Sequence, residues 1–289
     1  MTAIPWNRIN TGLLLAVLLA IIGLFASRAY GGPLDPPGAP ASTDGVREAG
    51  TPISSLPLVI SQPGRYYLTR DLTEPINANA ITIQTNDVTV DLHGFTLHGT
   101  AGLGNGVFVS GARTGVRIEH GNIRGFFNGI DATNATFSRL SDVTVIGNGQ
   151  ASFDGSAGVL IGANSVVEDC NVSSNTALGI ASYGATIRDC LVSNNGNDGV
   201  YVTGKSVMEH NHVRTNNQAT GSFFDVRVVG NAVLTDNWLG RVVMDLTTTV
   251  GYGYFLSNTV CLFATLGANV NNGYFPGAPN EGANTPTLC

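Results

Sequence analysis

Short apolar runs recur along the chain at intervals of about twenty residues. Three of them open on a glycine, at Gly158, Gly179 and Gly199, so that the openings lie 21 and 20 residues apart. Within each run every second residue is apolar, which is the period of a β-strand with one buried face. A second apolar run and an asparagine follow in each unit. The pattern predicts the coils of a solenoid, in which each unit buries its apolar face against its neighbours.

Less regular runs extend this pattern in both directions. Earlier units begin near Ile81, Gly106 and Gly129, and later ones near Asp225 and Ala232. Each run has a few residues bounded by glycine or asparagine, which favours strands and turns over helices. The sequence therefore predicts an all-β parallel β-helix of about seven to nine coils, with an N-terminal cap and an irregular C-terminal tail.

The chain divides into four predicted segments. Residues 1–29 hold Arg8, an apolar run and a small-x-small triplet, which indicates a signal peptide or an N-terminal membrane anchor. Residues 30–52 are rich in Pro, Gly and Ala and are typical of a linker. Residues 53–260 are the expected β-helix, and residues 261–289 its tail. We therefore expect a secreted or cell-envelope protein that meets a membrane only through its first segment.

Four cysteines in a chain predicted to be exported suggest disulfides. Cys261 and Cys289 are expected to pair and to attach the tail to the solenoid. Cys170 and Cys190 occupy the same phase of adjacent units. Stacked coils are close enough for a disulfide there, but parallel side-chain directions aim the sulfurs poorly, so a bond and two inward free thiols are both open.

Charge excludes one class of partner. The formal net charge is −6 and Lys205 is the single lysine, so no basic stripe is available to neutralise phosphates. We expect no nucleic-acid partner.

Several motifs together resemble the secreted right-handed parallel β-helix repeat proteins, in the broad pectate-lyase-like superfold. They are the opening phrase from Ile60 to Leu68, the runs Ile81–Ile83 and Val88–Leu97, and the coils from Gly106 to about Gly240. The resemblance implies that residues 53–75 form the N-terminal cap. Hydrolases of this superfold carry Asn-Thr-Asp and Asp-Asp phrases, and neither phrase occurs in this sequence.

An asparagine column is predicted at one turn of the solenoid. Asparagine amides can bond their counterparts in the next coil, and the short side chain suits a tight turn. We interpret the column as a structural ladder rather than a row of ligand contacts. Its members are Asn148, Asn175, Asn195 and Asn216.

In the first apolar run of each coil, the alternation of a β-strand directs one residue outward. These residues form the column Phe108, Asp131, Leu160, Ala181, Tyr201 and Arg227. Aromatic rings near both ends, with a carboxylate and a guanidinium, could bind polysaccharide. The candidate carbohydrate contacts are Phe108, Asp131, Tyr201 and Arg227. An ordinary solvated strand face is the other interpretation.

A second column reads His120, Asp142, Asp169, Asp189, His210 and Asp236. Successive carboxylates at Asp142, Asp169 and Asp189 could bind calcium, or could act in catalysis together with Arg188. Turn residues that recur because each coil needs them are the simpler explanation.

We therefore expect a non-catalytic solenoid that binds polysaccharide or other cell-envelope material, with no obligatory cofactor although calcium is possible. The alternatives are a lyase or uronate epimerase acting on acidic polysaccharide, and a structural or adhesive surface protein. Activity inferred from fold alone is an analogy.

Overall fold

The computed structural model describes residues 50–76, 78–100, 103–150, 155–217, 224–245, 253–256, 258–266 and 285–286. Contacts divide the chain into residues 1–49 and 50–289. The predicted signal peptide, most of the linker and Cys289 lie outside the described residues. Among the residues described, no helix is long and apolar enough to cross a membrane.

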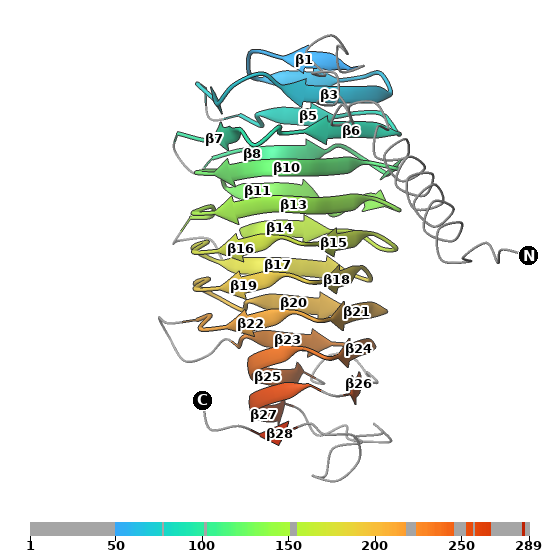
Figure 1. The fold of residues 1–289 in the computed structure, drawn as a ribbon, viewed down its shortest axis with the longest axis vertical. Coiled ribbons are helices and arrows are strands. Elements are labelled where there is room, and N and C mark those ends of the chain that lie inside the picture. Colours follow the sequence, from blue (N-terminus) through green and yellow to red (C-terminus); the bar gives the residue numbers. More distant parts are fainter. Residues whose placement is uncertain are drawn as a thin grey trace, which may run out of the picture. The chain divides into compact units, whose positions relative to one another are not determined.

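Strands stack in three series around a common core, in about seven turns (Figure 1). Stack I contains β2 (Leu58–Ile60), β5 (Ile81–Ile83), β8 (Asn105–Val109), β11 (Asn128–Ala132), β14 (Ala157–Ile161), β17 (Leu178–Tyr183), β20 (Val200–Thr203) and β23 (Val226–Val229). Stack II contains β1 (Thr51–Ile53), β3 (Gly64–Leu68), β6 (Val88–Asp91), β15 (Val166–Glu168), β18 (Thr186–Arg188), β21 (Ser206–Glu209), β24 (Ala232–Thr235) and β26 (Gly253–Leu256). Stack III contains β4 (Leu72–Thr73), β7 (Thr96–His98), β16 (Asn171–Ser173), β19 (Leu191–Ser193), β22 (His212–Arg214) and β28 (Thr285–Pro286).

Four longer strands take part in two stacks. The first halves of β10 (Arg117–Arg124) and β13 (Arg139–Ile146) belong to stack II and their second halves to stack III. The strands β25 (Trp238–Asp245) and β27 (Thr259–Leu266) begin in stack III and continue into stack I. A small separate pair joins β9 (Arg113–Thr114) to β12 (Ala135–Thr136).

All of these pairings are parallel, and their register follows the sequence repeat. Ile180 of β17 lies between Val159 of β14 and Val200 of β20, one coil away on each side. All three side chains are fully buried. The alternating runs therefore build one continuous apolar core, as the periodicity predicts. The expected N-terminal cap takes the form of a first coil, in which β2, β3 and β4 pair with β5, β6 and β7.

The corner between stacks II and III repeats one backbone conformation. Seven successive coils place a residue with φ between 52° and 55° there, namely His93, His120, Asp142, Asp169, Asp189, His210 and Asp236. We call this the left-handed corner. Asp and His are among the non-glycine residues that adopt this conformation most readily. The column of Asp and His residues predicted from the sequence therefore recurs because each coil needs a residue that tolerates positive φ at this corner.

The four predicted ladder asparagines lie in one buried column near the corner between stacks III and I. The Nδ2 groups of Asn148, Asn175 and Asn195 donate to the Oδ1 of the next asparagine at 3.1, 2.9 and 2.9 Å. The backbone N–H of each donates to the same acceptor at 3.0 Å. Asn216 is the last member of the series, and its backbone N–H and Nδ2 donate to the buried Asp225 carboxylate. These bonds satisfy polar groups that burial would otherwise leave unpaired.

A second ladder, which the sequence analysis did not identify, follows the left-handed corner. Asn211 donates through Nδ2 to Asn237, and Asn237 to Asn258, at 2.9 and 2.8 Å. In the two preceding coils Cys190 and Cys170 hold the equivalent position, and Cys190 N–H still donates to Asn211 Oδ1. Because the column changes from cysteine to asparagine, a search of the sequence for one repeated residue type does not find it.

Candidate functional site

The outward column of stack I is the first candidate surface. Strand register puts Phe108 beside Asp131, Leu160 beside Ala181, and Tyr201 beside Arg227, as the alternation predicts. We call this column, with the neighbouring Tyr183, the aromatic face. Ala181 is fully buried despite its outward position, whereas the other members of the column are partly exposed.

Both charged members of the aromatic face have partners within the protein. Asp131 Oδ1 accepts hydrogen bonds from the Thr133 hydroxyl at 2.9 Å and the Thr133 backbone N–H at 3.2 Å. Arg227 Nε donates to the buried Asp198 carboxylate at 2.7 Å, and its guanidinium lies 5.3 Å from the centre of the Phe224 ring. Only 15% of the Arg227 side chain is exposed. Its guanidinium therefore stabilises the solenoid, and its contact with carbohydrate stays a prediction.

Tyr183 adds an exposed aromatic ring to this face, with 41% of its surface accessible. It is the last residue of β17 and pairs with Thr203, the last residue of β20 in the next coil. Burial raises the pKa of Tyr183, and the nearby Tyr201 and Asp131 raise it further. The two phenols and the carboxylate thus share one electrostatic neighbourhood. The sequence signal was present, since Tyr183 is two residues beyond Ala181 and points the same way.

Phe137 is a second aromatic residue that the sequence analysis missed. Its φ is 52° and 68% of its surface is exposed. Register along β13, β15 and β18 aligns it with Asn164 and Gly184, both of which also have positive φ. A bulky aromatic at such a position is an outlier, because a left-handed L-residue costs roughly 1–2 kcal/mol.

The predicted acidic column lies along the left-handed corner. Asp142, Asp169 and Asp189 are exposed and follow one another in adjacent coils. Histidine His210 stands between Asp189 and Asp236, with its ring nitrogens 4.0 Å from each carboxylate. Calcium binding by the three aspartates stays a prediction.

Arg188, the expected catalytic partner of these aspartates, bonds elsewhere. Its Nε donates to Glu168 Oε2 at 2.9 Å, and Arg139 pairs with the other oxygen of the same carboxylate. Burial raises the pKa of Glu168, but the hydrogen bonds from Arg188 and Arg139 outweigh it, so that the net shift is downward. These two ion pairs to the buried Glu168 carboxylate hold Arg188 in a structural role, which the proposed catalytic grouping did not foresee.

One group of side chains has the composition and spacing of a metal site. Ligand atoms of Asp91, Glu119 and His120 lie within 4.8 Å of one another. Asp91 is the residue at the end of β6, and strand pairing sets it beside Glu119 of β10. Arg65 pairs with Asp91 Oδ2 and lies 3.9 Å from Glu119.

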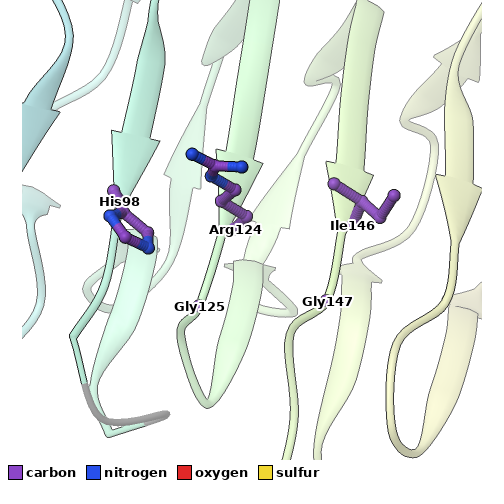
Figure 2. A pocket seen from close by; sticks show the side chains of 5 residues that line it. All are labelled: His98, Arg124, Gly125, Ile146 and Gly147. Carbon is purple, nitrogen blue, oxygen red and sulfur yellow. The ribbon is translucent and has the colours of Figure 1, made fainter.

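Stack III carries a shallow hollow and an aromatic pair. The hollow has a volume of about 490 Å³ and is lined by His98, Arg124, Gly125, Ile146 and Gly147. The side chains of His98, Arg124 and Ile146 come from three neighbouring strands, β7, β10 and β13 (Figure 2). Further along the stack, His212 and Trp238 are stacked with ring centres 4.1 Å apart. Trp238 is half exposed. Burial and then Arg214 lower the pKa of His212.

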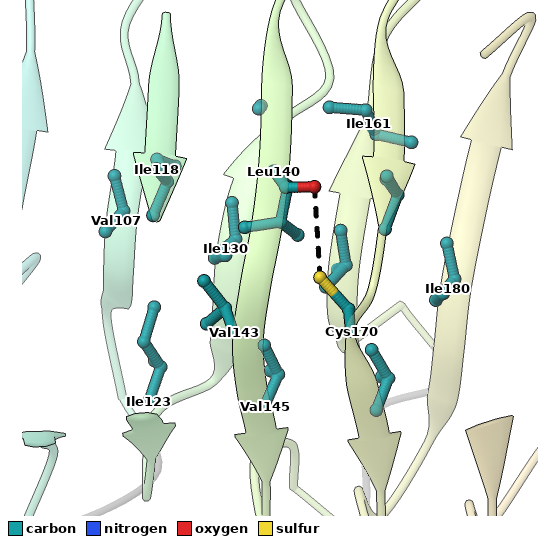
Figure 3. Packing of buried hydrophobic residues seen from close by; sticks show 14 of the residues in the cluster. Val107, Ile118, Ile123, Ile130, Leu140, Val143, Val145, Ile161, Cys170 and Ile180 are labelled. Atoms are coloured by element: carbon teal, nitrogen blue, oxygen red, sulfur yellow. Dashed lines mark hydrogen bonds between the residues drawn. The ribbon is translucent and has the colours of Figure 1, made fainter. Parts of the chain in front are cut away.

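Cys170 and Cys190 are both free and buried, which is the free-thiol alternative of the two left open. Cys170 Sγ points into the core among Val143, Val145 and Leu140, and lies 3.8 Å from the Leu140 carbonyl oxygen (Figure 3). The side chain of Cys261 and all of Cys289 lie outside the described residues, so the pairing of those two stays a prediction.

A comparison with protein families agrees with this architecture. A family model described as "Right handed beta helix region" matches residues 79–234, more than half of the chain. The crystal structure of pectate lyase Pel9A matches 76% of this chain and 66% of that one, at 13% identity and a TM-score of 0.44. The crystal structure of Dettilon tailspike protein (gp208) matches 75% and 55%, at 14% and 0.46. The chain thus spans less than two thirds of each, and the likeness is weak and concerns the fold alone. The search of curated proteins finds no match.

Proposed function

Since the chain belongs to the family of right-handed β-helix proteins, we propose that it is an exported solenoid whose aromatic face binds polysaccharide. The observation that carries the proposal is the grouping of Tyr183, Tyr201 and Asp131 on one outward face. Sugar rings stack on aromatic rings, and phenol and carboxylate groups can bond sugar hydroxyls.

The geometry of stack I suits an extended ligand. Its strands are parallel and about 4.8 Å apart, so the outward side chains form a regular row along the solenoid. Phe108, Leu160 and Tyr201 supply partly exposed apolar surface on that row. Thr133 holds the Asp131 carboxylate in place, so this polar group loses little freedom when a ligand binds.

A binding role is favoured over a lyase or epimerase by the state of Arg188. Proton abstraction next to a carboxylate needs a base within hydrogen-bonding reach and a positive group for the resulting charge. Arg188 is already bonded to Glu168, and Asp142, Asp169 and Asp189 are corner residues of three different coils.

Isothermal titration calorimetry with neutral and acidic polysaccharides tests the proposal. Tyr201→Ala and Tyr183→Ala should each weaken binding about tenfold, since an aromatic contact contributes about 0.5–1.5 kcal/mol beyond its buried area. Trp238→Ala removes a half-exposed aromatic residue of stack III and should leave affinity unchanged. No heat of binding with any polysaccharide, or a loss confined to Trp238→Ala, would overturn the proposal.

A further inference from the structure

We propose that Asp91, Glu119 and His120, with His93 as a fourth ligand, bind one divalent ion of the zinc class. The group lies on stack II and the left-handed corner, away from the outward column of stack I, and the proposal does not depend on polysaccharide binding.

The first argument is distance. His120 Nδ1 lies 3.3 Å from Asp91 Oδ1. Two ligands of a tetrahedral zinc ion, each about 2.0–2.1 Å from the metal, lie about 3.3–3.4 Å apart. His93 Nε2 is 3.8 Å from the other oxygen of Asp91. A Glu119 carboxylate oxygen lies within 4.8 Å of the ligand atoms of Asp91 and His120. Small side-chain rotations of exposed groups would bring all four donors to one ion.

The second argument is how firmly Asp91 is held. Only 2% of its side chain is exposed, and the His93 backbone N–H donates to Oδ1 at 2.8 Å while Arg65 pairs with Oδ2. Metal-binding carboxylates usually have outer partners of this kind, which fix the direction of the ligand atom. The Tyr67 ring lies 5.3 Å from that of His93 and limits the orientation of the imidazole.

Charge and access are also suitable. Arg65 is shared by two carboxylates, Asp91 and Glu119, so this pair keeps an excess of negative charge. The His120 and His93 side chains are 51% and 35% exposed, so the group is open to solvent on one side. An ion can enter from that side and keep water as a further ligand.

The donor set selects the class of metal. Calcium takes six to eight oxygen ligands, whereas imidazole nitrogen suits zinc, nickel and copper. Two imidazoles and two carboxylates therefore favour zinc over calcium, the ion considered possible at Asp142, Asp169 and Asp189.

Calorimetric titration of the chelator-treated full chain with zinc alone tests the inference. One ion should bind, and His120→Asn and His93→Asn should each weaken it at least tenfold, because loss of even an outer-sphere partner costs 10- to 100-fold in affinity. Asparagine tolerates the left-handed backbone at both positions, so the fold is kept. Cobalt(II) in place of zinc should give a visible absorption band that disappears in His120→Asn.

Two matched controls locate the site. His98→Asn alters the hollow of stack III, and His210→Asn alters the corner histidine between Asp189 and Asp236; both variants should bind zinc like the unmodified chain. No zinc binding, binding that survives both His120→Asn and His93→Asn, or a loss seen only with His210→Asn would each overturn the inference.

Discussion

Replacing one ladder asparagine tests how strongly the buried amides hold the coils together. Asn195→Ala deletes four side-chain hydrogen bonds. Asn195 Oδ1 accepts from Asn175 N and Nδ2 at 3.0 and 2.9 Å, and its Nδ2 donates to Val172 O and Asn216 Oδ1 at 3.1 and 2.9 Å. At about 1 kcal/mol net for each bond, the free energy of unfolding should fall by about 4 kcal/mol. That is a large fraction of the 5–15 kcal/mol typical of folded domains.

Urea unfolding followed by circular dichroism measures this change, with fluorescence as a second probe of whether the coils unfold together. Asn197→Ala is the matched control, because it makes the same substitution two residues away at a partly exposed site. The control should stay within about 0.5 kcal/mol of the unmodified protein. Equal unfolding midpoints for the two variants would refute the additive hydrogen-bond reasoning.

Three further predictions concern the left-handed backbone, the ion pairs of Glu168 and the thiols. Phe137→Gly should raise the free energy of unfolding by about 1 kcal/mol, because glycine has no penalty at positive φ, whereas Phe137→Leu should not; a lower melting temperature for the glycine variant would contradict this. The lowered pKa of Glu168 means that its stabilising contribution is complete above its ordinary value of 4.5 and is lost as pH falls through the lowered folded value. Glu168→Gln should therefore unfold at lower urea than the unmodified chain at neutral pH, and the gap should shrink at about pH 3; an unchanged gap would contradict the assignment. Contact with Cys170 and burial hold the pKa of the Cys190 thiol well above its usual range, so N-ethylmaleimide should modify the peptides holding both cysteines only after unfolding, and rapid labelling of the folded protein would argue against it.

Regular units made the fold and the first ladder predictable from sequence. Asn148, Asn175, Asn195 and Asn216 follow equivalent apolar runs, so counting from those runs places them in one column. The same counting gave the outward register of Phe108, Tyr201 and Arg227. It could not show that Arg227 bonds Asp198, because the side chain can point either along the face or into the turn.

The zinc group was hidden by an irregular coil. The left-handed corner at His93 is two residues longer than the next one, because Asp91 and Thr96 pair with Glu119 and Asn122. Counting from the regular units stops before this coil, and Asp91 was therefore never aligned with Glu119. Strand pairing in three dimensions supplies that alignment.

The first asparagine ladder has a direction, since every rung donates toward the C-terminal coil and accepts from the N-terminal one. A solenoid cut on the C-terminal side of Asn195 is left with two unmatched N–H donors, from the backbone and Nδ2. A cut on the other side leaves one unused Oδ1 and one unmatched donor, the Nδ2 N–H that otherwise bonds the Val172 carbonyl. Unmatched buried donors are the rarer defect in proteins. During synthesis the N-terminal coils emerge first, so the growing end always lacks an acceptor until the next coil docks. The Asp225 carboxylate accepts hydrogen bonds from the backbone N–H and the Nδ2 of Asn216. Because Asp225 has no side-chain amide to donate to a further coil, the ladder ends there.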